Sequence, residues 1–349
     1  MIGAGAIGTK HAAAAVATEG VELALVCDRD GARAQELAEE HGAASADNEA
    51  AALGDASIDG VVIAVPNRFH TPMTLAALEA GKHVLLEKPM AITVDDCRKI
   101  VAAVESSGKH LQIGHVHRFT AMGKAAKDIV DAGELGSVYH AKAHLYLRRS
   151  VPGLGGWFTN KEMSGGGAMI DLGVHLLDLA LYLTGFHAAQ RVSGSVYSTF
   201  GKRMKDYVYE SMWAGPPRYD GVCDVEDSGH ALIHFEGGMT LDLNVCWAGN
   251  FPDGSLPDSF MGFFGDRGGM TFHLYGDHVT VAHEHCGRNV DTRYKLAETD
   301  ELAGQMADFL AGATGGASIG AKPRQSLAVQ TLVDAVYQSS EKQETIVLG

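Results

Sequence analysis

Residues 3–8 read GAGAIG and satisfy the pattern GxGxxG, which occurs where a strand turns into a helix that binds a dinucleotide. Gly3, Gly5 and Gly8 permit a tight turn and a close approach of the backbone to a pyrophosphate, and Ala6 and Ile7 begin the helix whose N-terminus attracts it. The pattern is weak on its own, because short glycine motifs also arise by chance. The residues that follow it therefore decide the interpretation.

The next β-rich run, VELALVCD at residues 21–28, ends in Asp28, 20 residues after Gly8. An acidic residue at this distance binds the adenosine ribose hydroxyls of NAD. Asp28 would repel the 2′-phosphate of NADP, whereas Arg29 beside it would attract that group, so NAD is predicted and NADP is the alternative. A simpler interpretation is that Asp28 ends a strand at a turn.

Short β-rich runs alternate with alanine-rich segments over the first third of the chain, as in GVVIAVP (60–66), HVLLEKP (83–89) and HLQIGH (110–115). This rhythm predicts βαβ units around a parallel sheet, and hence a Rossmann dinucleotide-binding domain over residues 1–120. Only Met1 and Ile2 precede Gly3, so the central strand is predicted to be truncated. Either the given start lies downstream of the natural one or the fold tolerates a stub, and in both cases we expect weaker cofactor binding.

Longer β-rich runs follow residue 120, at 138–149, 228–248 and 260–283. They predict an α+β domain over residues 121–349 with a mostly antiparallel, open sheet, for an α/β protein overall. The sequence GGMT occurs at 237–240 and at 268–271, and both copies are predicted to form hairpin turns. The segment Lys202 to Asp224 is predicted to interrupt the sheet as a long loop.

Composition limits the classes of partner. The 349 residues are long enough for two domains, and the formal net charge of -15 argues against nucleic acid, whose binding needs a basic surface. The five cysteines are odd in number, without a CxxC pair, which favours a reducing compartment. We found no apolar run near the roughly 20 residues that span a bilayer, so we expect a cytoplasmic protein without a membrane partner.

The stretch GGGAMIDLGVHLLDLALYLTG, residues 165–185, predicts a buried helix that carries a polar stripe. Asp171, His175, Asp178 and Tyr182 follow at intervals of four, three and four residues, and burying them requires internal hydrogen bonds or a polar ligand. Because imidazole changes protonation near neutral pH, His175 is the natural acceptor of an alcohol proton, and Asp171 would orient it or bind a hydroxyl. Asp178 and Tyr182 are interpreted as structural, and the glycines at 165–167 as allowing a ligand to approach the backbone.

Glu87, Lys88 and Pro89 end the run HVLLEKP, where ligands of parallel sheets bind. The ammonium of Lys88 would stabilise an alcohol oxygen as hydride leaves carbon, although an exposed lysine at a turn is the alternative. We predict a cis peptide bond before Pro89. Four histidines at 273, 278, 283 and 285, with Cys286, invite a metal site, but their spacing does not fit a tetrahedral one and no metal is predicted.

These motifs together resemble the Gfo/Idh/MocA family, the glucose-fructose oxidoreductase and inositol dehydrogenase group, over nearly the whole chain. The resemblance is carried by GAGAIGTKH at the start, AVPNRFH (64–70), EKPMA (87–91), IGHVHRF (113–119), GGGAMIDLGVHLLD (165–178), DVEDSGHALIHFEGG (224–238) and a C-terminal PRQSLAVQTLVDAVYQSS. It implies NAD or NADP bound between a Rossmann domain and an α/β domain. It also implies a homodimer or homotetramer formed through the C-terminal sheet.

The resemblance assigns further roles. Pro66, Asn67 and His70 would bind the nicotinamide half, Glu87 and Lys88 would face cofactor and substrate, and Asp171 and His175 would meet the reacting alcohol. His117, before Arg118, departs from the family pattern, and both residues are assigned to substrate binding. The segment 145–163, LYLRRSVPGLGGWFTNKEM, adds Arg148, Trp157 and Phe158, which suit a pyranose ring, although Arg148 and Arg149 fit solvated strand-end charges equally well.

The predicted function is transfer of a hydride between a secondary alcohol of a sugar, glycoside, anhydrosugar or polyol and NAD(P), with C3 of a pyranose as the candidate position. The carbohydrate is the only partner expected besides further copies of the chain. One alternative is a glycosidase that oxidises its substrate transiently with a tightly held NAD. Another is a regulator that senses the dinucleotide or a sugar without turnover, although such a protein has no need of Lys88, Asp171 and His175.

Overall fold

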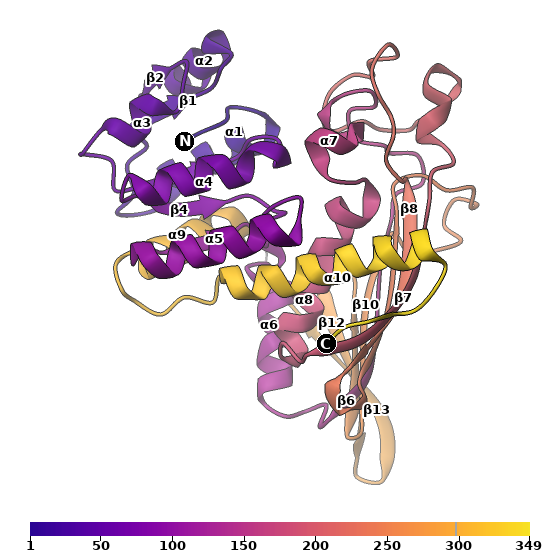
Figure 1. The fold of residues 1–349 in the computed structure, drawn as a ribbon. Helices are drawn as coiled ribbons and strands as arrows, with labels where there is room; N and C mark the ends of the chain where they lie inside the picture. The colour runs from indigo at the N-terminus through magenta and orange to yellow at the C-terminus, as the bar shows by residue number, and fades with distance from the viewer. Residues whose placement is uncertain (297–298) are drawn as a thin grey trace. The chain divides into compact units, whose positions relative to one another are not determined.

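The computed structural model describes residues 1–296 and 299–349, whose contacts group into two compact units (Figure 1). The first unit contains Met1–Phe119 and Asp300–Gln330, and the second contains Thr120–Thr299 and Thr331–Gly349. Residues 121–349 were predicted to form the second domain, whereas residues 300–330 return to the first unit. The reason is packing: Met306 and Phe309 of α9 (Glu301–Ala313) join the hydrophobic core of the first unit.

The first unit contains a parallel sheet. Its strands are β1 (Leu25–Cys27), β2 (Ala44–Ala46), β3 (Gly60–Ile63), β4 (His83–Leu86) and β5 (Leu111–Ile113). β1 pairs with β2, and β3, β4 and β5 pair in that order. Ile2 forms parallel bridges to Cys27 and Ile63, so it joins the two groups in the order β2, β1, Ile2, β3, β4, β5.

The central strand is short but fully hydrogen-bonded. The Ile2 and Gly3 amides donate to the carbonyls of Val62 and Cys27, at 2.8 Å each, and the Ile2 carbonyl accepts from Ala64 at 2.8 Å. The Met1 ammonium donates to the Leu25 carbonyl at 2.7 Å, and burial lowers its pKa to about 6. The short central strand therefore keeps its backbone hydrogen bonds to the strands on both sides.

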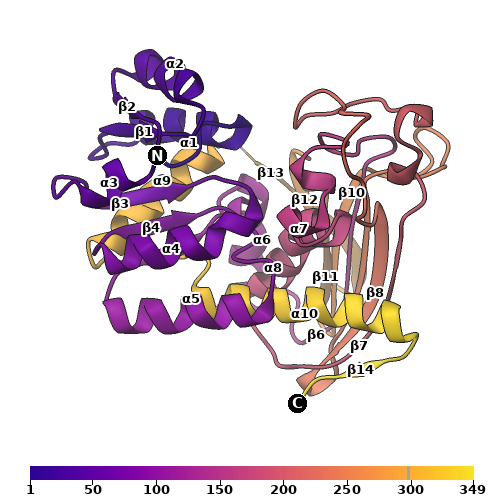
Figure 2. The same ribbon diagram turned by 45° about the horizontal axis from the view of Figure 1, so that its top comes forward.

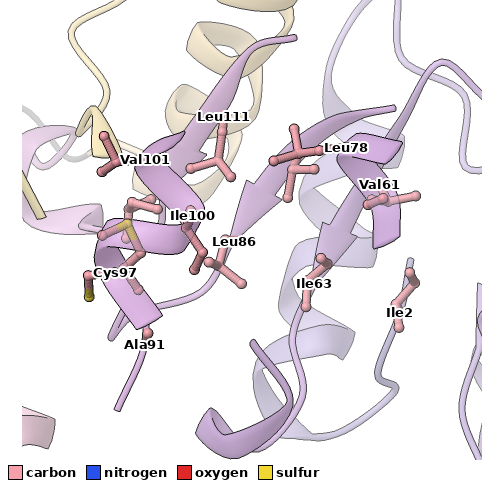
Figure 3. Close-up of a cluster of buried hydrophobic side chains, with 14 of the residues drawn as sticks. Ile2, Val61, Ile63, Leu78, Leu86, Ala91, Cys97, Ile100, Val101 and Leu111 are labelled. Atoms are coloured by element: carbon pink, nitrogen blue, oxygen red, sulfur yellow. The ribbon is translucent and has the colours of Figure 1, made fainter. Parts of the chain in front are cut away.

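Helices cover both faces of this sheet, because β3 and β4 alternate their apolar side chains between two cores. On one face, Val61, Ile63 and Leu86 pack against Leu78 and Ile100 (Figure 3). The other face packs against α1, α2 and α9. The helices of this unit are α1 (Ala6–Ala17), α2 (Gly31–His41), α3 (Ala50–Gly54), α4 (His70–Glu79), α5 (Val94–Ser107) and α9, with short 3-10 turns at η1 (Asn67–Phe69) and η2 (Val116–Arg118).

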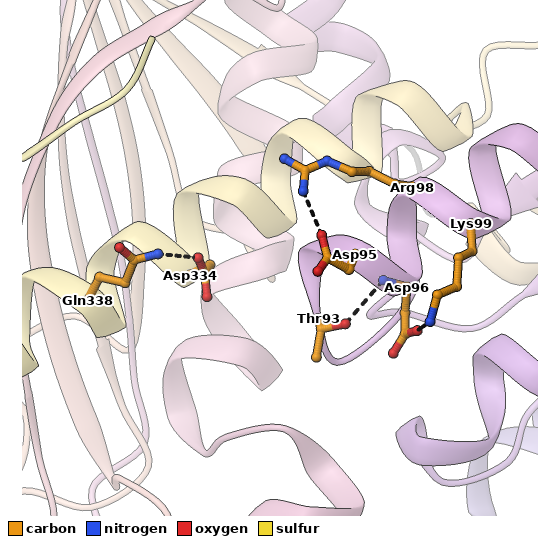
Figure 4. Close-up of polar contacts among 7 residues, drawn as sticks. All are labelled: Thr93, Asp95, Asp96, Arg98, Lys99, Asp334 and Gln338. Atoms are coloured by element: carbon orange, nitrogen blue, oxygen red, sulfur yellow. Dashed lines mark hydrogen bonds and ion pairs between the residues drawn. The ribbon is translucent and has the colours of Figure 1, made fainter.

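Local sequence explains where α5 begins and ends. The Thr93 hydroxyl accepts a hydrogen bond from the Asp96 amide at 3.1 Å, as an N-cap does (Figure 4). Asp95 and Asp96 lie in the first turn and pair with Arg98 and Lys99. Gly108 ends the helix at a φ of 66°, a conformation that glycine adopts without strain.

The second unit contains a nine-stranded sheet in the order β13, β12, β11, β10, β6, β9, β8, β7, β14. Only the pair β6 and β9 is parallel among these described strands, which confirms the prediction of a mostly antiparallel sheet. The strands are β6 (Val138–Tyr146), β7 (Ala189–Tyr197), β8 (Ser228–Phe235), β9 (Thr240–Cys246), β10 (Ser259–Gly265), β11 (Gly268–Phe272), β12 (His278–His285), β13 (Arg288–Lys295) and β14 (Ile346–Val347).

The two GGMT copies differ in structure. The first contributes Gly237 and Gly238, with φ of 83° and 91°, to the turn η6 (Glu236–Gly238) between β8 and β9, as predicted. The second begins β11 itself, so that prediction was wrong. A side chain at residue 268 of this strand is disfavoured, because a Cβ there would lie 2.8 Å from the Glu134 carbonyl oxygen. The predicted long loop from residue 202 to 224 contains only the short turn η5 (Gly201–Asp206).

Helices of the second unit are α6 (Ala121–Asp131), α7 (Lys161–Ser164) and α8 (Val174–Thr184), with η3 (Trp157–Thr159), and α10 (Pro323–Lys342) continues from the first unit (Figure 2). A π-helical turn, η4 (Met169–Gly173), precedes α8, so the predicted helix is not α-helical throughout. The stretch Lys161–Thr184 is long and apolar enough to cross a membrane, contrary to our expectation, but its apolar window is 89% buried within the protein. It has the burial of a core helix.

Candidate functional site

In the glycine turn of the first unit, Gly3 and Gly8 pack tightly against the backbone, whereas the position of Gly5 is open. Gly3 has a φ of 99°, and a Cβ there would lie 2.3 Å from the Ala64 carbonyl oxygen. A Cβ on Gly8 would lie 2.0 Å from the Gly3 carbonyl oxygen. A Cβ on Gly5 meets no heavy atom within 4 Å, and no side chain caps α1, which Gly5 precedes. The open position at a helix N-terminus fits a pyrophosphate.

The carboxylate of Asp28 ties this turn to the end of β1. Its Oδ2 accepts the Ala4 amide at 2.8 Å and its Oδ1 accepts the Asp30 amide at 2.9 Å. Each carboxylate oxygen has a second lone pair, so these bonds leave room for a ribose hydroxyl. The turn interpretation and the ribose-binding interpretation of Asp28 are therefore compatible. Arg29 lies exposed beside it.

His70, predicted above to bind the cofactor, holds two loops of the protein together. Its Nδ1 lies 2.7 Å from the Pro89 carbonyl oxygen and its Nε2 lies 2.8 Å from the Val65 carbonyl oxygen, and the residue is 1% exposed. Burial lowers the pKa of His70, against the two carbonyl contacts that raise it. These two contacts fix the loop that carries Pro66 and Asn67, and cofactor binding by His70 stays a prediction.

Glu87, predicted above to face cofactor and substrate, has two partners within the protein. Its Oε1 lies 2.6 Å from Nε2 of the buried His11, and its Oε2 accepts the Lys88 amide at 3.1 Å. Burial works to raise the pKa of Glu87, but the hydrogen bond and charge of His11, with the charge and amide of Lys88, hold that pKa below its usual range. Glu87 therefore anchors the backbone of Lys88 from inside the unit. The Lys88–Pro89 bond is cis, as predicted.

Arg118 was assigned to substrate binding, but it is buried and holds the returning segment of the first unit. Its Nη1 donates to the Ile319 carbonyl at 3.1 Å and to Gln325 Oε1 at 3.0 Å. These contacts give the guanidinium, which is 1% exposed, a structural role, and its part in substrate binding stays a prediction. His117 is 7% exposed, which is buried like its neighbour.

In the second unit, the predicted polar stripe begins within the π-helical turn. Asp171 lies in η4 and is 6% exposed, whereas His175 lies in α8 and is half-buried. Asp178 is 1% exposed, and the ammonium of Lys127 lies 5.6 Å from the centroid of the Tyr182 ring. π-helical turns occur frequently at functional sites, so the irregular turn supports the choice of this helix.

The glycines before this helix are explained by the protein itself, not by an approaching ligand as we expected. Cβ atoms on Gly166 and Gly167 would lie 2.1 Å from Tyr337 Oη and 1.8 Å from the Glu226 carbonyl oxygen. Oε1 of the buried Glu226 accepts the amides of Gly167 and Met169, each at 2.9 Å. Sequence reasoning missed Glu226, although DVED in the family motif contains it.

Trp247 makes a polar contact that the sequence did not predict. Its indole Nε1 donates to Asp171 Oδ2 at 3.0 Å, and the residue is 1% exposed. The contact connects the end of β9 to the turn that carries Asp171.

An aromatic group lies on the segment before α7 and on the long loop. The rings of Trp157 and Phe158 stack with centroids 3.8 Å apart, and the Trp213 ring meets Phe158 edge-on at 5.1 Å. Trp213 is 53% exposed and was missed because it lies in an irregular loop. Arg148 forms an ion pair of 3.3 Å with Glu210, which lies on the same loop as Trp213. The guanidinium of Arg149 stacks on the ring of Phe200.

No group of three or more His, Cys, Asp or Glu side chains is arranged to hold a metal ion within the described ranges 1–296 and 299–349. The carboxylates and imidazoles described above lie in both units. In the first unit they lie near the glycine turn and the EKP segment, residues 87–89. In the second unit they lie in or next to η4.

Comparisons with known proteins agree with this geometry. Residues 1–115 match the oxidoreductase family with an NAD-binding Rossmann fold, and residues 124–279 match the GFO/IDH/MocA C-terminal domain. The chain is 35% identical to D-glucoside 3-dehydrogenase of Escherichia coli (strain K12), over 98% of this chain and 94% of that protein.

Solved structures share the fold. An oxidoreductase domain protein from Kribbella flavida has a TM-score of 0.85 at 22% identity, covering 100% of this chain and 98% of that one. A levoglucosan dehydrogenase solved with NADH has a TM-score of 0.84 at 22% identity, with the same coverage. The two family models, on a chain whose Gly5 turn is open to a pyrophosphate, show that this protein is an NAD-binding oxidoreductase of the GFO/IDH/MocA family.

Proposed function

We propose that this chain is an NAD-dependent dehydrogenase that oxidises a secondary alcohol of a carbohydrate, and that its preferred position is the C3 hydroxyl of a glucoside. The observation that carries the proposal is the Asp171 and His175 pair on a buried helix, in a chain with an open glycine turn. The 35% identity to a D-glucoside 3-dehydrogenase over 98% of the chain supports the substrate class.

The first unit would hold the cofactor. The amides of the turn from Gly3 to Gly8 would bind the pyrophosphate, and Asp28 would bind the adenosine ribose hydroxyls. Pro66 and Asn67, on the loop that His70 fixes, would border the nicotinamide. NAD, when bound, supplies the hydride acceptor.

The protein's own residues would manage the proton and the charge on oxygen. As the C–H bond of the alcohol breaks and the C=O bond forms, the imidazole of His175 takes the hydroxyl proton. Lys88 stabilises the negative charge that develops on that oxygen. Asp171, buried one turn before His175, orients the imidazole or binds a neighbouring hydroxyl.

Sugar recognition would come from the aromatic group of the second unit. Trp157, Phe158 and Trp213 present flat apolar surfaces that suit the C–H face of a pyranose ring. Arg148 adds a donor at the edge of the same group. His117 and Arg118 stay candidates for substrate binding, although both are buried and Arg118 also binds Gln325.

The test is reduction of NAD, followed by absorbance, with methyl glucosides, free glucose, levoglucosan and myo-inositol as separate substrates and NADP as the alternative cofactor. We expect the fastest turnover with a glucoside and NAD. A substrate deuterated at C3 should react more slowly than one deuterated at C2. An equal rate for the two would overturn oxidation at C3, and no reduction of cofactor by any substrate, in protein that binds NAD, would favour a glycosidase or a sensor.

Matched variants assign the roles. His175→Asn and Lys88→Met should each lower kcat at least a hundredfold, within the range for loss of an acid–base or oxyanion-stabilising group. His285→Asn and Lys99→Met remove the same groups from exposed positions on β12 and α5 and should leave kcat unchanged. Near-normal turnover in His175→Asn or Lys88→Met would remove that residue from the mechanism.

The assembly belongs to the same proposal: a homodimer or homotetramer formed through the face of the sheet that carries His140, His144 and Phe260. On β6, His140 and His144 alternate with the buried Ala141 and Ala143. The His144 ring stacks on Phe260 of β10, with ring centroids 5.5 Å apart. Phe260→Glu should lower the mass measured by light scattering, whereas Val347→Glu, at a residue 75% exposed, should not.

The described chain contains five free cysteines, which supports a cytoplasmic location, because disulfides are rare in reducing compartments. Treating the purified protein with a reducing agent should leave its unfolding temperature unchanged.

A further inference from the structure

The contact between Trp247 and Asp171 joins two buried groups. Trp247 is 1% exposed and Asp171 is 6% exposed, and Nε1 of the indole lies 3.0 Å from Oδ2 of the carboxylate. An indole N–H only donates, so its orientation specifies which carboxylate oxygen accepts. Hydrogen bonds to carboxylates are shorter and stronger than those between neutral groups, and burial strengthens them further.

The backbone of Trp247 is held on both sides, so the indole projects from a fixed position. Its amide donates to the Asp227 carbonyl and its carbonyl accepts from the Ser150 amide, each at 2.8 Å. Asp227 is itself anchored, because its Oδ2 accepts the amides of Thr199 and Phe200 at 2.8 and 2.5 Å. The side chain itself is 1% exposed, and close packing around it restricts its rotamers.

The turn that carries Asp171 is brought close to the strand that precedes Trp247. A Cβ on Gly173 would lie 4.0 Å from Val245 Cγ1, which is van der Waals contact, so η4 packs against β9 at this residue. The π-helical geometry of η4 also means that the direction of Asp171 differs from that of an α-helical residue. The position of this carboxylate thus depends on a contact from outside its own helix.

We propose that Trp247 is a positioning residue for the dehydrogenase reaction: its indole N–H fixes the rotation of the Asp171 carboxylate, so that the carboxylate serves the reacting alcohol and His175 in one orientation. The inference rests on the proposed function, which assigns Asp171 to the reaction. It adds a residue that does not touch the substrate. Misplacing a reacting or orienting group by about 1 Å costs up to a hundredfold in rate.

The test is a double-mutant cycle on kcat. Trp247→Phe keeps an aromatic ring and removes the N–H, and it should lower kcat about tenfold to a hundredfold while the Kd for NADH stays the same. In the Asp171→Asn background, Trp247→Phe should cause no further loss, because the carboxylate that it orients is gone. Tyr139→Phe, which removes a hydroxyl donor from an aromatic residue 59% exposed on β6, is the matched control for the cycle. Its effect on kcat should be independent of Asp171→Asn.

Two outcomes of the cycle overturn the inference. If the losses from Trp247→Phe and Asp171→Asn multiply in an active enzyme, Trp247 does not act through Asp171, although the proposed function stands. If the wild type binds NADH but oxidises no carbohydrate, the proposed function fails and the inference fails with it.

A spectroscopic measurement tests the contact itself, even where Trp247→Phe does not fold. The chain contains three tryptophans, so a protein labelled with ¹⁵N at the indoles gives three side-chain N–H signals. Asp171→Ala should move one of them strongly to higher field, because that N–H loses its carboxylate acceptor, and Trp213→Phe should remove a different one. An unmoved set of signals in Asp171→Ala would overturn the inference.

Discussion

The phenol of Tyr337, on α10, donates a hydrogen bond of 2.8 Å to the carboxylate of Glu226. The same carboxylate oxygen accepts the Gly167 and Met169 amides at the start of η4, each at 2.9 Å. Burial and the nearby charge of Glu226 raise the pKa of Tyr337 well above its usual range, which keeps the hydroxyl available as a donor. The helix that carries Asp171 is thus anchored through a buried polar pair.

Tyr337→Phe should therefore destabilise the protein by about 2 kcal/mol, the cost of removing a donor from a buried carboxylate. The free energy of unfolding in urea measures this change. Tyr139→Phe removes a hydroxyl from a residue 59% exposed and should alter the free energy by less than about 0.5 kcal/mol. Equal losses in the two variants would show that Glu226 does not need the Tyr337 hydroxyl.

The pH dependence of stability should change in Glu226→Gln. Burial raises the pKa of Glu226, against the amides of Met169 and Gly167 and the Tyr337 hydroxyl, which lower it. Between its ordinary pKa and the raised value, the folded protein binds more protons than the unfolded one, so this group makes stability fall as pH rises through that window. Glutamine does not titrate and should remove this fall. Urea unfolding of both proteins from about pH 4.5 upward tests the difference, and parallel curves would contradict the assignment.

Replacing glycines in the turn should separate cofactor binding from folding. Gly5→Ala adds a methyl group to open space and should leave the unfolding temperature unchanged, yet weaken NADH binding at least tenfold by crowding the pyrophosphate. Gly3→Ala should lower the unfolding temperature, because its φ of 99° and a contact of 2.3 Å with Ala64 exclude a side chain. NADH fluorescence and thermal unfolding measure the two effects. Normal NADH binding by Gly5→Ala would place the pyrophosphate elsewhere.

His11→Leu should make the protein more sensitive to acid. Burial raises the pKa of Glu87, but the contacts with His11 and Lys88 outweigh burial and lower the pKa overall. The carboxyl group therefore releases its proton more readily in the folded protein than in the unfolded one. That contribution to stability is present above the ordinary pKa of glutamate and is lost as pH falls through the lowered value. Without His11, the buried carboxylate of Glu87 lacks this partner, and the free energy of unfolding should fall by about 2 to 4 kcal/mol at neutral pH.

Circular dichroism measures the midpoint of acid unfolding, which should lie at higher pH in His11→Leu than in the wild type. His11→Gln keeps a donor toward Glu87 and should retain part of the stability. A midpoint in His11→Leu equal to that of the wild type would show that the His11 contact does not hold the pKa of Glu87 down.

Some features followed from sequence alone because local spacing dictates them. The GxGxxG turn and the strand ending at Asp28 are short-range patterns, and so are the buried helix around His175 and the cis bond before Pro89. In each case neighbouring residues determine the backbone conformation. The same reasoning did not give the partners that lie far along the chain, as with the contacts of His70 and Arg118 and those of the glycines at 166 and 167.

The sequence by itself determined the alternation of strands and helices, the two kinds of sheet and the positions of Asp171 and His175 on one helix. Only the tertiary structure decided that residues 300–330 return to the first unit, that η4 is π-helical, and that Trp247 contacts Asp171 across 76 residues. The physical reason is that side-chain periodicity reports which face of an element is buried. It carries no information about which distant donor satisfies a buried carboxylate, because that choice depends on how the elements pack.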